Sequence, residues 1–220
     1  MRATSSPARR PRPSSLERRD QILREAARCF GTRGFRGTTT RDVANAVGIT
    51  EAALYRYFPG KEAMYAAILD ARMAAPEVTA ALEPLTRARD DRRVFTELAL
   101  TILRSVEADP SFLRLLLYSA LENHEMARPF YETRMRRLRE FLTRYIAQRV
   151  RDGAFRAVDP VLSARAFVGM VADHLIVRTV FGQRDPQTQS LERVAETFTS
   201  IYLDGVLVRA ARKRGGVTRG

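Results

Sequence analysis

The chain has 220 residues, 45% of them hydrophobic and 29% charged, a composition typical of a soluble globular protein. No run of 18 apolar residues indicates a membrane span, and no apolar run follows the N-terminal arginines as a secretory signal requires. The single cysteine excludes a disulfide within the chain. These features favour a cytoplasmic protein with no membrane partner.

The net charge of +13 lies mostly at the two ends of the chain. Residues 1–15 hold four arginines, and residues 206–220 hold four arginines and one lysine, with no acidic residue in either range. We expect residues 1–15 to form a disordered basic arm and residues 212–220 a flexible basic tail. Such ends fit an attraction to DNA phosphates, and they are also common on proteins that use them only for solubility.

The first predicted helix starts near Ser15 and ends between Gly31 and Gly34. Ile22, Ala26 and Phe30 recur on one face at the helical period. Cys29 falls on the same apolar side, so we interpret it as a small buried hydrophobe rather than a redox-sensing thiol.

The sequence from 38 to 61, TTTRDVANAVGITEAALYRYFPGK, predicts two short helices joined by a tight turn. Thr39 or Thr40 can cap the first helix, and Gly48 can end it in the left-handed conformation. Thr50 can cap the second, which we expect from Glu51 to Tyr57. Apolar residues are spaced to meet inside the angle between them: Val43, Ala44, Val47, Ile49 and Leu54. This pattern predicts a helix-turn-helix whose second helix contacts DNA.

The longer run TTTRDVANAVGITEAALYRYFPGKEAMYAAIL resembles the DNA-binding signature of the TetR family of bacterial transcription regulators. Its most specific parts are the helix-turn-helix, LYRYF from Leu54 to Phe58, and a lysine at Lys61. The resemblance covers residues 16–69 by motif. It implies an all-α fold of about nine helices. Residues 16–62 would form a three-helix DNA-binding domain, and residues 63–211 a helical bundle for ligand binding and dimerisation.

The resemblance also implies which residues contact DNA: Thr40, Arg41, Thr50, Glu51, Ala52, Ala53, Tyr55, Arg56, Tyr57 and Lys61. Residues at the start of the second short helix would meet base edges, whereas the tyrosine hydroxyls and the lysine would bind phosphates. Glu51 departs from the expected chemistry, and it could accept from a cytosine amine or cap its own helix. Ala52 and Ala53 offer only methyl contacts, so the operator sequence cannot be derived from these residues.

Apolar periodicity predicts further helices over residues 91–107, 110–123 and 125–151, with one or two short pieces between 74 and 89. Three Asp-Pro pairs match an aspartate cap followed by proline in the first helical position. These pairs are Asp109-Pro110, Asp159-Pro160 and Asp185-Pro186.

The last two predicted helices indicate a dimer interface. The helix over 161–181 is apolar on more than one face, and the helix from 187 to about 211 carries a continuous apolar stripe. Two such helices from each subunit would form a four-helix interface in a homodimer, the arrangement that the resemblance implies. The alternative is a helix buried wholly within the monomer.

A catalytic function is disfavoured, because the two histidines and the cysteine are far apart and no metal-binding or nucleophile motif is present. We therefore expect no enzyme activity, no catalytic residue, no cofactor and no metal. His174 beside Asp173 fits a structural histidine or a polar group facing a ligand cavity. Candidate cavity residues, which could equally be core, are Phe112, Tyr118, Phe130, Tyr131, Phe167, Met170 and His174.

Together these patterns predict a ligand-responsive transcriptional regulator, more often a repressor in such families. It would bind a palindromic operator in double-stranded DNA as a homodimer and be released by an unknown small molecule. The alternative is a DNA-organising protein without a ligand, which would bind with little sequence preference. A third reading is a helical enzyme or adaptor with an incidental helix-turn-helix.

Overall fold

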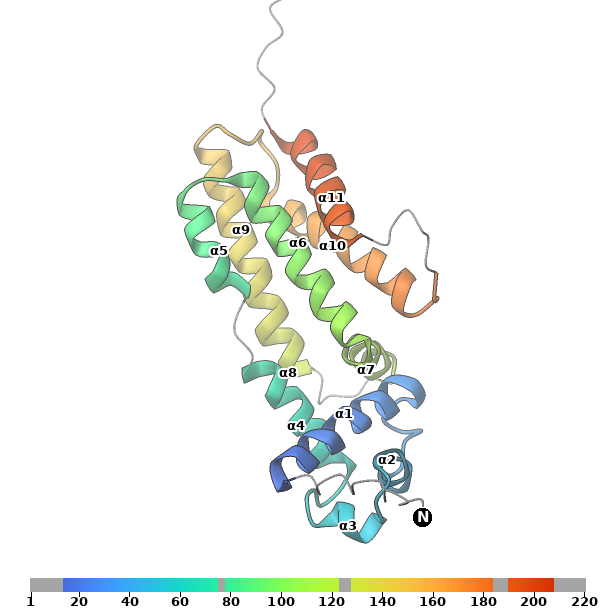
Figure 1. The fold of residues 1–220 in the computed structure, drawn as a ribbon. Helices are drawn as coiled ribbons and strands as arrows, with labels where there is room; N and C mark the ends of the chain where they lie inside the picture. The colour runs from blue at the N-terminus through green and yellow to red at the C-terminus, as the bar shows by residue number, and fades with distance from the viewer. Residues whose placement is uncertain (1–13, 75–77, 123–127, 184–189, 208–220) are drawn as a thin grey trace, which may run out of the picture. The chain divides into compact units, whose positions relative to one another are not determined.

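The computed structural model describes residues 14–74, 78–122, 128–183 and 190–207 (Figure 1). The predicted basic tail, the arm before residue 14 and the helix start at Asp185-Pro186 lie outside these residues. The all-α prediction is confirmed, since the only β pairing within the described ranges is one isolated bridge between Phe155 and Leu207. The chain divides into two compact units, residues 1–74 with 111–127 and residues 75–110 with 128–220.

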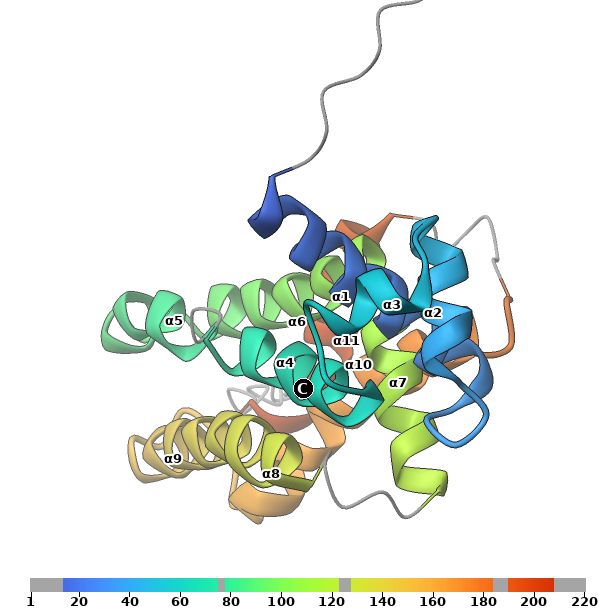
Figure 2. The same ribbon diagram turned by 90° about the horizontal axis from the view of Figure 1, so that it is seen from below.

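The first unit contains five helices: α1 (Ser15–Arg33), α2 (Thr40–Val47), α3 (Glu51–Tyr55), α4 (Lys61–Ala74) and α7 (Pro110–Leu121). It is larger than the predicted DNA-binding domain because α4 and α7 pack with the first three helices. Figure 2 shows α1, α2 and α3 adjacent to one another. A capping box starts α1, in which Ser14 accepts from the Glu17 amide and Glu17 accepts from the Ser14 amide.

The core of the first unit is built around three aromatic rings. Phe30 of α1, Phe35 of the following loop and Tyr65 of α4 have ring centroids 5.4–5.6 Å apart. Ile22 of α1 and Leu54 of α3 are also fully buried in this unit. Cys29 is half-buried, and burial raises the pKa of its thiol, which disfavours the reactive thiolate.

The second unit contains the remaining helices: α5 (Val78–Arg87), α6 (Asp91–Ala108), α8 (Arg128–Phe130), the π-helical turn η2 (Tyr131–Met135), α9 (Arg136–Arg151), α10 (Pro160–Thr179) and α11 (Leu191–Val206). The segment from α8 to α9 forms one continuous helical run, as the predicted helix over 125–151 anticipates. Pro84 lies inside α5 and does not interrupt it. In Figure 1, α6 lies beside α11, and α10 packs against α6, α9 and α11.

The core of the second unit centres on Phe95 of α6. Its ring lies 4.8 Å from that of Phe167 in α10 and 4.7 Å from that of Tyr202 in α11. At one end of this core, the Arg149 guanidinium donates to both carboxylate oxygens of Asp91, each at 2.8 Å. The Tyr145 hydroxyl also donates to Asp91. This buried network joins α6 to α9.

Helix α10 presents apolar surface that the described part of the chain does not cover. By length and composition it is the one described helix that could cross a membrane, a property that core helices of soluble proteins share. Only 22% of its apolar window is buried within the chain. Leu162 is 62% exposed, and Ile201 of α11 is 59% exposed. Helices α10 and α11 therefore retain an unpartnered apolar face.

Candidate nucleic-acid interface

The helix-turn-helix is built by local capping. The Thr39 hydroxyl accepts from the Asp42 amide, and Asp42 accepts in return from the Thr39 amide, so Thr39 caps α2. The Thr39 hydroxyl and the Thr39 amide both donate to the Asp42 carboxylate, and these two hydrogen bonds hold the pKa of that carboxyl below its usual range. Gly48 ends α2 with φ of 75°, a left-handed conformation that glycine adopts without a Cβ penalty. The Thr50 hydroxyl then accepts from the Ala53 amide and starts α3.

Apolar side chains fix the angle between α2 and α3. Val43, Ala44, Val47 and Leu54 are buried there, whereas Ile49 is half-buried. Helix α3 is two residues shorter than predicted, because the amides of Tyr57 and Phe58 both donate to the Leu54 carbonyl and close a tighter turn. Arg56 and Tyr57 therefore lie in the turn after α3.

Nine of the ten predicted DNA-contacting residues lie on α2 and α3, at the cap of α3 or in the turn that follows, and Lys61 begins α4. Arg41, Thr50, Ala52, Tyr55 and Arg56 are exposed; Thr40, Glu51, Ala53, Tyr57 and Lys61 are half-buried. The side chains of Arg41 and Arg56 make no hydrogen bond or ion pair within the described ranges. Two guanidiniums are thus available to phosphates or guanines beside tyrosine and threonine hydroxyls.

Glu51 is engaged within the protein. The Thr40 hydroxyl of α2 donates to the Glu51 carboxylate at 2.5 Å, and Thr40 Oγ1 lies 3.3 Å from the Tyr55 hydroxyl. Glu51 does not cap its own helix, since Thr50 does. Glu51 instead joins α3 to α2, a role that sequence reasoning missed because the two residues belong to different helices.

Lys61 is also engaged within the protein. Its ammonium donates to the carbonyls of Phe35 at 3.0 Å and Thr38 at 3.2 Å, and it lies 4.5 Å from the centroid of the Phe35 ring. These contacts hold the loop between α1 and α2 from the first turn of α4. The phosphate contact predicted for Lys61 stays a prediction.

Helix α7 contributes side chains to the end of α1 and to the same loop. The Arg114 guanidinium donates to the Gly31 carbonyl at 2.7 Å, and the Tyr118 hydroxyl donates to the Thr32 carbonyl at 3.1 Å. Both carbonyls lie in the last turn of α1, where no intrahelical partner is available. Glu122, just after α7, accepts from the amides of Phe35 and Arg36. The sequence analysis did not single out Arg114 or Glu122 as contacts of this loop. Their signal was a charged side chain within or just after an otherwise apolar helix.

The seven predicted ligand-contacting residues are divided between the two units. Phe112 and Tyr118 belong to the first unit, where Phe112 lies under the Arg72 guanidinium. The other five belong to the second unit: Phe130, Tyr131, Phe167, Met170 and His174.

Within the second unit, these five residues have different environments. Phe130 and Phe167 are buried, the latter within the aromatic core, and Tyr131 is exposed. Met170 lines a groove between α10 and α11. His174 Nε2 is buried without a hydrogen-bond partner in the described part of the chain, and burial lowers the pKa of this histidine.

Two family models match the chain. The model of bacterial regulatory proteins of the tetR family covers residues 22–68, which include the helix-turn-helix. The model of the AefR-like transcriptional repressor C-terminal domain covers residues 93–205. The chain belongs to the TetR family. This confirms the resemblance predicted from residues 16–69 and extends it through most of the second unit.

Relatives of this TetR-family chain include the transcriptional repressor KstR2 of Rhodococcus jostii. That protein is 32% identical over 193 residues, which cover 86% of this chain and 91% of the relative. The solved structure of the ketosteroid transcriptional regulator KstR2 of Mycobacterium tuberculosis has a TM-score of 0.66 and 22% identity, covering 89% of this chain and 98% of that chain. This second comparison supports the fold.

A further solved structure shows AibR in complex with isovaleryl coenzyme A and operator DNA. Its TM-score is 0.59 and its identity 25%, covering 84% of this chain and 97% of that chain. Regulators of the TetR family bind DNA and are not enzymes, so the predicted regulatory, non-enzymatic function is confirmed. The chain is a DNA-binding transcriptional regulator.

Proposed function

We propose that this regulator is a homodimeric cytoplasmic repressor that binds a palindromic operator and is released by a small-molecule effector. The observation that carries the proposal is the outer surface of α2 and α3, where Arg41 and Arg56 are unpaired within the described residues beside exposed Thr50 and Tyr55. Repressor function is supported by the relative KstR2, which is named a repressor. An effector is supported by AibR, whose structure holds a coenzyme A thioester and operator DNA.

The unpartnered face of α10 and α11 supports dimerisation. Leu162 and Ile201 are exposed there and line one groove with Met170. Gly169 and Gly205 lie in the two helices with open space around the position that a Cβ would take. A glycine inside a helix costs about 1 kcal/mol relative to alanine, and close approach of another backbone offsets that cost. A second copy of the chain seated on this face would bury these groups in a four-helix interface.

A dimer of this kind presents two α3 helices to DNA. Two half-sites of a palindrome lie roughly 34–36 Å apart, one turn of B-DNA. An effector that favours a different separation of the two helices weakens operator binding, with a coupling typically of about 1–3 kcal/mol. Among the proposed effector contacts, His174 has the strongest support, because a polar ligand atom would satisfy its buried Nε2.

The proposal is tested by selecting binding sites from random duplex DNA with the full chain, then measuring affinity for the selected site and for scrambled DNA at rising salt. We expect a palindromic consensus and a preference for it that persists at physiological salt. Binding that is equal for all duplexes and disappears as salt rises would instead support the DNA-organising alternative.

The same assay tests the α3 surface directly. Tyr55→Phe removes only a hydroxyl, and we expect it to weaken binding to every duplex by about tenfold, because a hydrogen bond to a charged phosphate is lost. Ser105→Ala, which also removes a single hydroxyl, at an exposed position of α6, is the matched control and should bind like the natural chain. Equal affinities for the two variants would remove Tyr55 from the proposed interface.

A further inference from the structure

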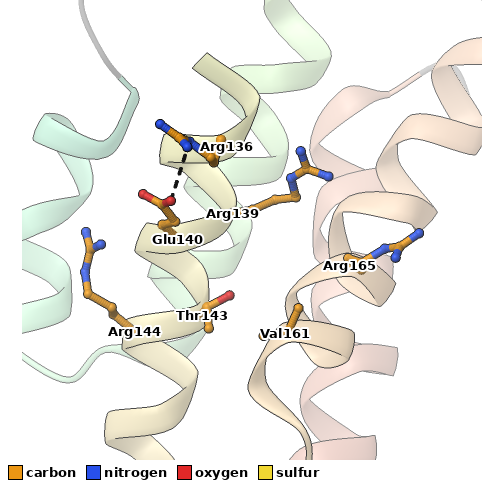
Figure 3. Close-up of a pocket in the computed structure, with 7 residues that line it drawn as sticks. All are labelled: Arg136, Arg139, Glu140, Thr143, Arg144, Val161 and Arg165. Carbon is orange, nitrogen blue, oxygen red and sulfur yellow. Dashed lines mark ion pairs between the residues drawn. The ribbon is translucent and has the colours of Figure 1, made fainter. Parts of the chain in front are cut away.

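An arginine-lined groove lies between α9 and α10 of the second unit (Figure 3). Its volume is about 440 Å³, within the range of roughly 300–1,000 Å³ found for small-molecule sites. Its lining residues come from one face of α9 and the first turns of α10: Arg136, Arg139, Glu140, Thr143, Arg144, Val161 and Arg165. Figure 3 shows Arg139 extending from α9 toward α10, which carries Val161 and Arg165.

The groove has an uncompensated positive charge. Four guanidiniums line it against one carboxylate, that of Glu140, which lies 3.6 Å from Arg136. Within the described ranges, Arg139, Arg144 and Arg165 have no carboxylate at ion-pair distance. By contrast, Arg104, Arg149 and Arg178 of the same unit are each paired with an acidic residue. Like charges gathered in one groove repel one another unless an anion occupies it.

One guanidinium of the groove is held in place. Arg139 lies 4.8 Å from the centroid of the Tyr131 ring, and it donates to the Tyr131 hydroxyl at 3.0 Å and to the Met135 carbonyl at 3.3 Å. These contacts use part of its donor set and reduce the entropy that binding would cost. Guanidiniums match phosphate oxygens through paired hydrogen bonds, and Thr143 adds a hydroxyl.

We propose that this groove binds a small molecule that carries a diphosphate. Four arginines line the groove and three of them have no carboxylate partner among the described residues, a charge that suits a ligand with more than one phosphate, and the size of the groove suits a small molecule. The groove is distinct from the face assigned to dimerisation, because Leu162, Ala166 and Met170 line the other groove, beside α11. Diphosphate binding by this groove does not depend on the proposed function. The expectation that an occupied groove changes operator affinity does rest on it.

The test is isothermal titration calorimetry of the full chain at 150 mM salt with ADP, coenzyme A and inorganic pyrophosphate, and with adenosine as the uncharged control. We expect the three diphosphates to bind and adenosine to fail. Tighter binding of ADP or coenzyme A than of pyrophosphate would assign the site to nucleotide-linked diphosphates, and the reverse order to the free anion. No binding by any of the three would overturn the inference.

The double variant Arg139→Gln with Arg165→Gln should weaken diphosphate binding by at least about tenfold, because it removes a guanidinium from each helix. Its control, Arg92→Gln with Arg93→Gln, makes the same charge change at exposed positions of α6 and should alter affinity less than about twofold. Equal losses in both variants would show a general charge effect and overturn the site. Loss of affinity for scrambled duplex DNA with diphosphate binding unchanged would make the groove a DNA contact instead.

Operator affinity is then measured with and without the diphosphate that binds best. A change that disappears in the double groove variant links the site to regulation. Failure to select a palindrome with diphosphate binding intact would count against the proposed function and leave the groove standing. Selection of a palindrome by a chain that does not bind any diphosphate would count against the groove alone.

Discussion

Glu51 and Lys61 are charged residues in the DNA-binding region, and both use their charge within the protein. Glu51 accepts from Thr40 across the angle between α2 and α3, and Lys61 donates to two carbonyls of the loop before α2. A carboxylate occupied by a threonine hydroxyl is less available to a cytosine amine. The sequence pattern allows base contact by Glu51, whereas the contacts favour a role in positioning α3.

Replacing Glu51 separates these two roles. We expect Glu51→Ala to weaken binding to all duplexes by about two- to tenfold, since one hydrogen bond contributes roughly 0.5–1.5 kcal/mol. The selected consensus should stay the same. Thr40→Val, which removes the partner hydroxyl, should reproduce this result in the same binding-site selection. A new consensus from Glu51→Ala but not from Thr40→Val would show that Glu51 contacts a base.

At the scale of elements, α7 belongs with the DNA-binding helices although 35 residues, 75–109, lie between the end of α4 and its own start. Arg114 and Tyr118 satisfy carbonyls at the end of α1, and Glu122 satisfies two amides of the following loop. Inside the same unit, Tyr65 of α4 and Ser119 of α7 share a buried hydrogen bond. The loop that leads into α2 is therefore held by side chains from two helices, α4 and α7.

Glu122→Ala tests this arrangement. It leaves the Phe35 and Arg36 amides without their carboxylate acceptor, so we expect a loss of about 1–3 kcal/mol in the free energy of unfolding. Hydrogen exchange at those two amides should also become faster. Glu83→Ala in α5 removes an exposed ion pair with Arg87 and should cost less than about 1 kcal/mol, with no change at those amides. Unchanged exchange in Glu122→Ala would contradict the role given to α7.

At the scale of the whole molecule, the apolar face of α10 and α11 needs a partner. An apolar helix that the chain covers only in part fits either a membrane span or a subunit interface. Helix α10 begins with a side-chain cap and carries arginines, and the neighbouring α11 exposes Ile201. These features favour a second subunit over a membrane. The two interior glycines, Gly169 and Gly205, would let the backbones approach.

In the proposed homodimer, Gly205→Leu should therefore weaken the association of the two subunits without unfolding the monomer. Among the described residues, no atom beyond the adjoining backbone of α11 lies within 4 Å of a Cβ at this position, so we expect the new side chain to meet the partner. Overpacking costs about 1–3 kcal/mol, which raises the dimer dissociation constant by at least about fivefold. Sedimentation at several concentrations measures this, with circular dichroism as the check on folding. Ala81→Leu, at an exposed position of α5, is the control and should sediment like the natural chain. A Gly205→Leu chain as dimeric as the natural one would place the interface elsewhere.

By itself, the sequence determined the helical class, most helix boundaries and the helix-turn-helix, because caps and apolar periodicity act within a few residues of one another. Thr39, Gly48 and Asp159 each fulfil a local role that their neighbours specify. Tertiary structure alone decided that Lys61 and Glu51 bond inward, that α7 joins the first unit, and that arginines of α9 and α10 line one groove. Those outcomes depend on partners far apart in the chain, as with Glu122 and Phe35, which are 87 residues apart. A charged side chain carries no sign of its partner until folding brings the two together.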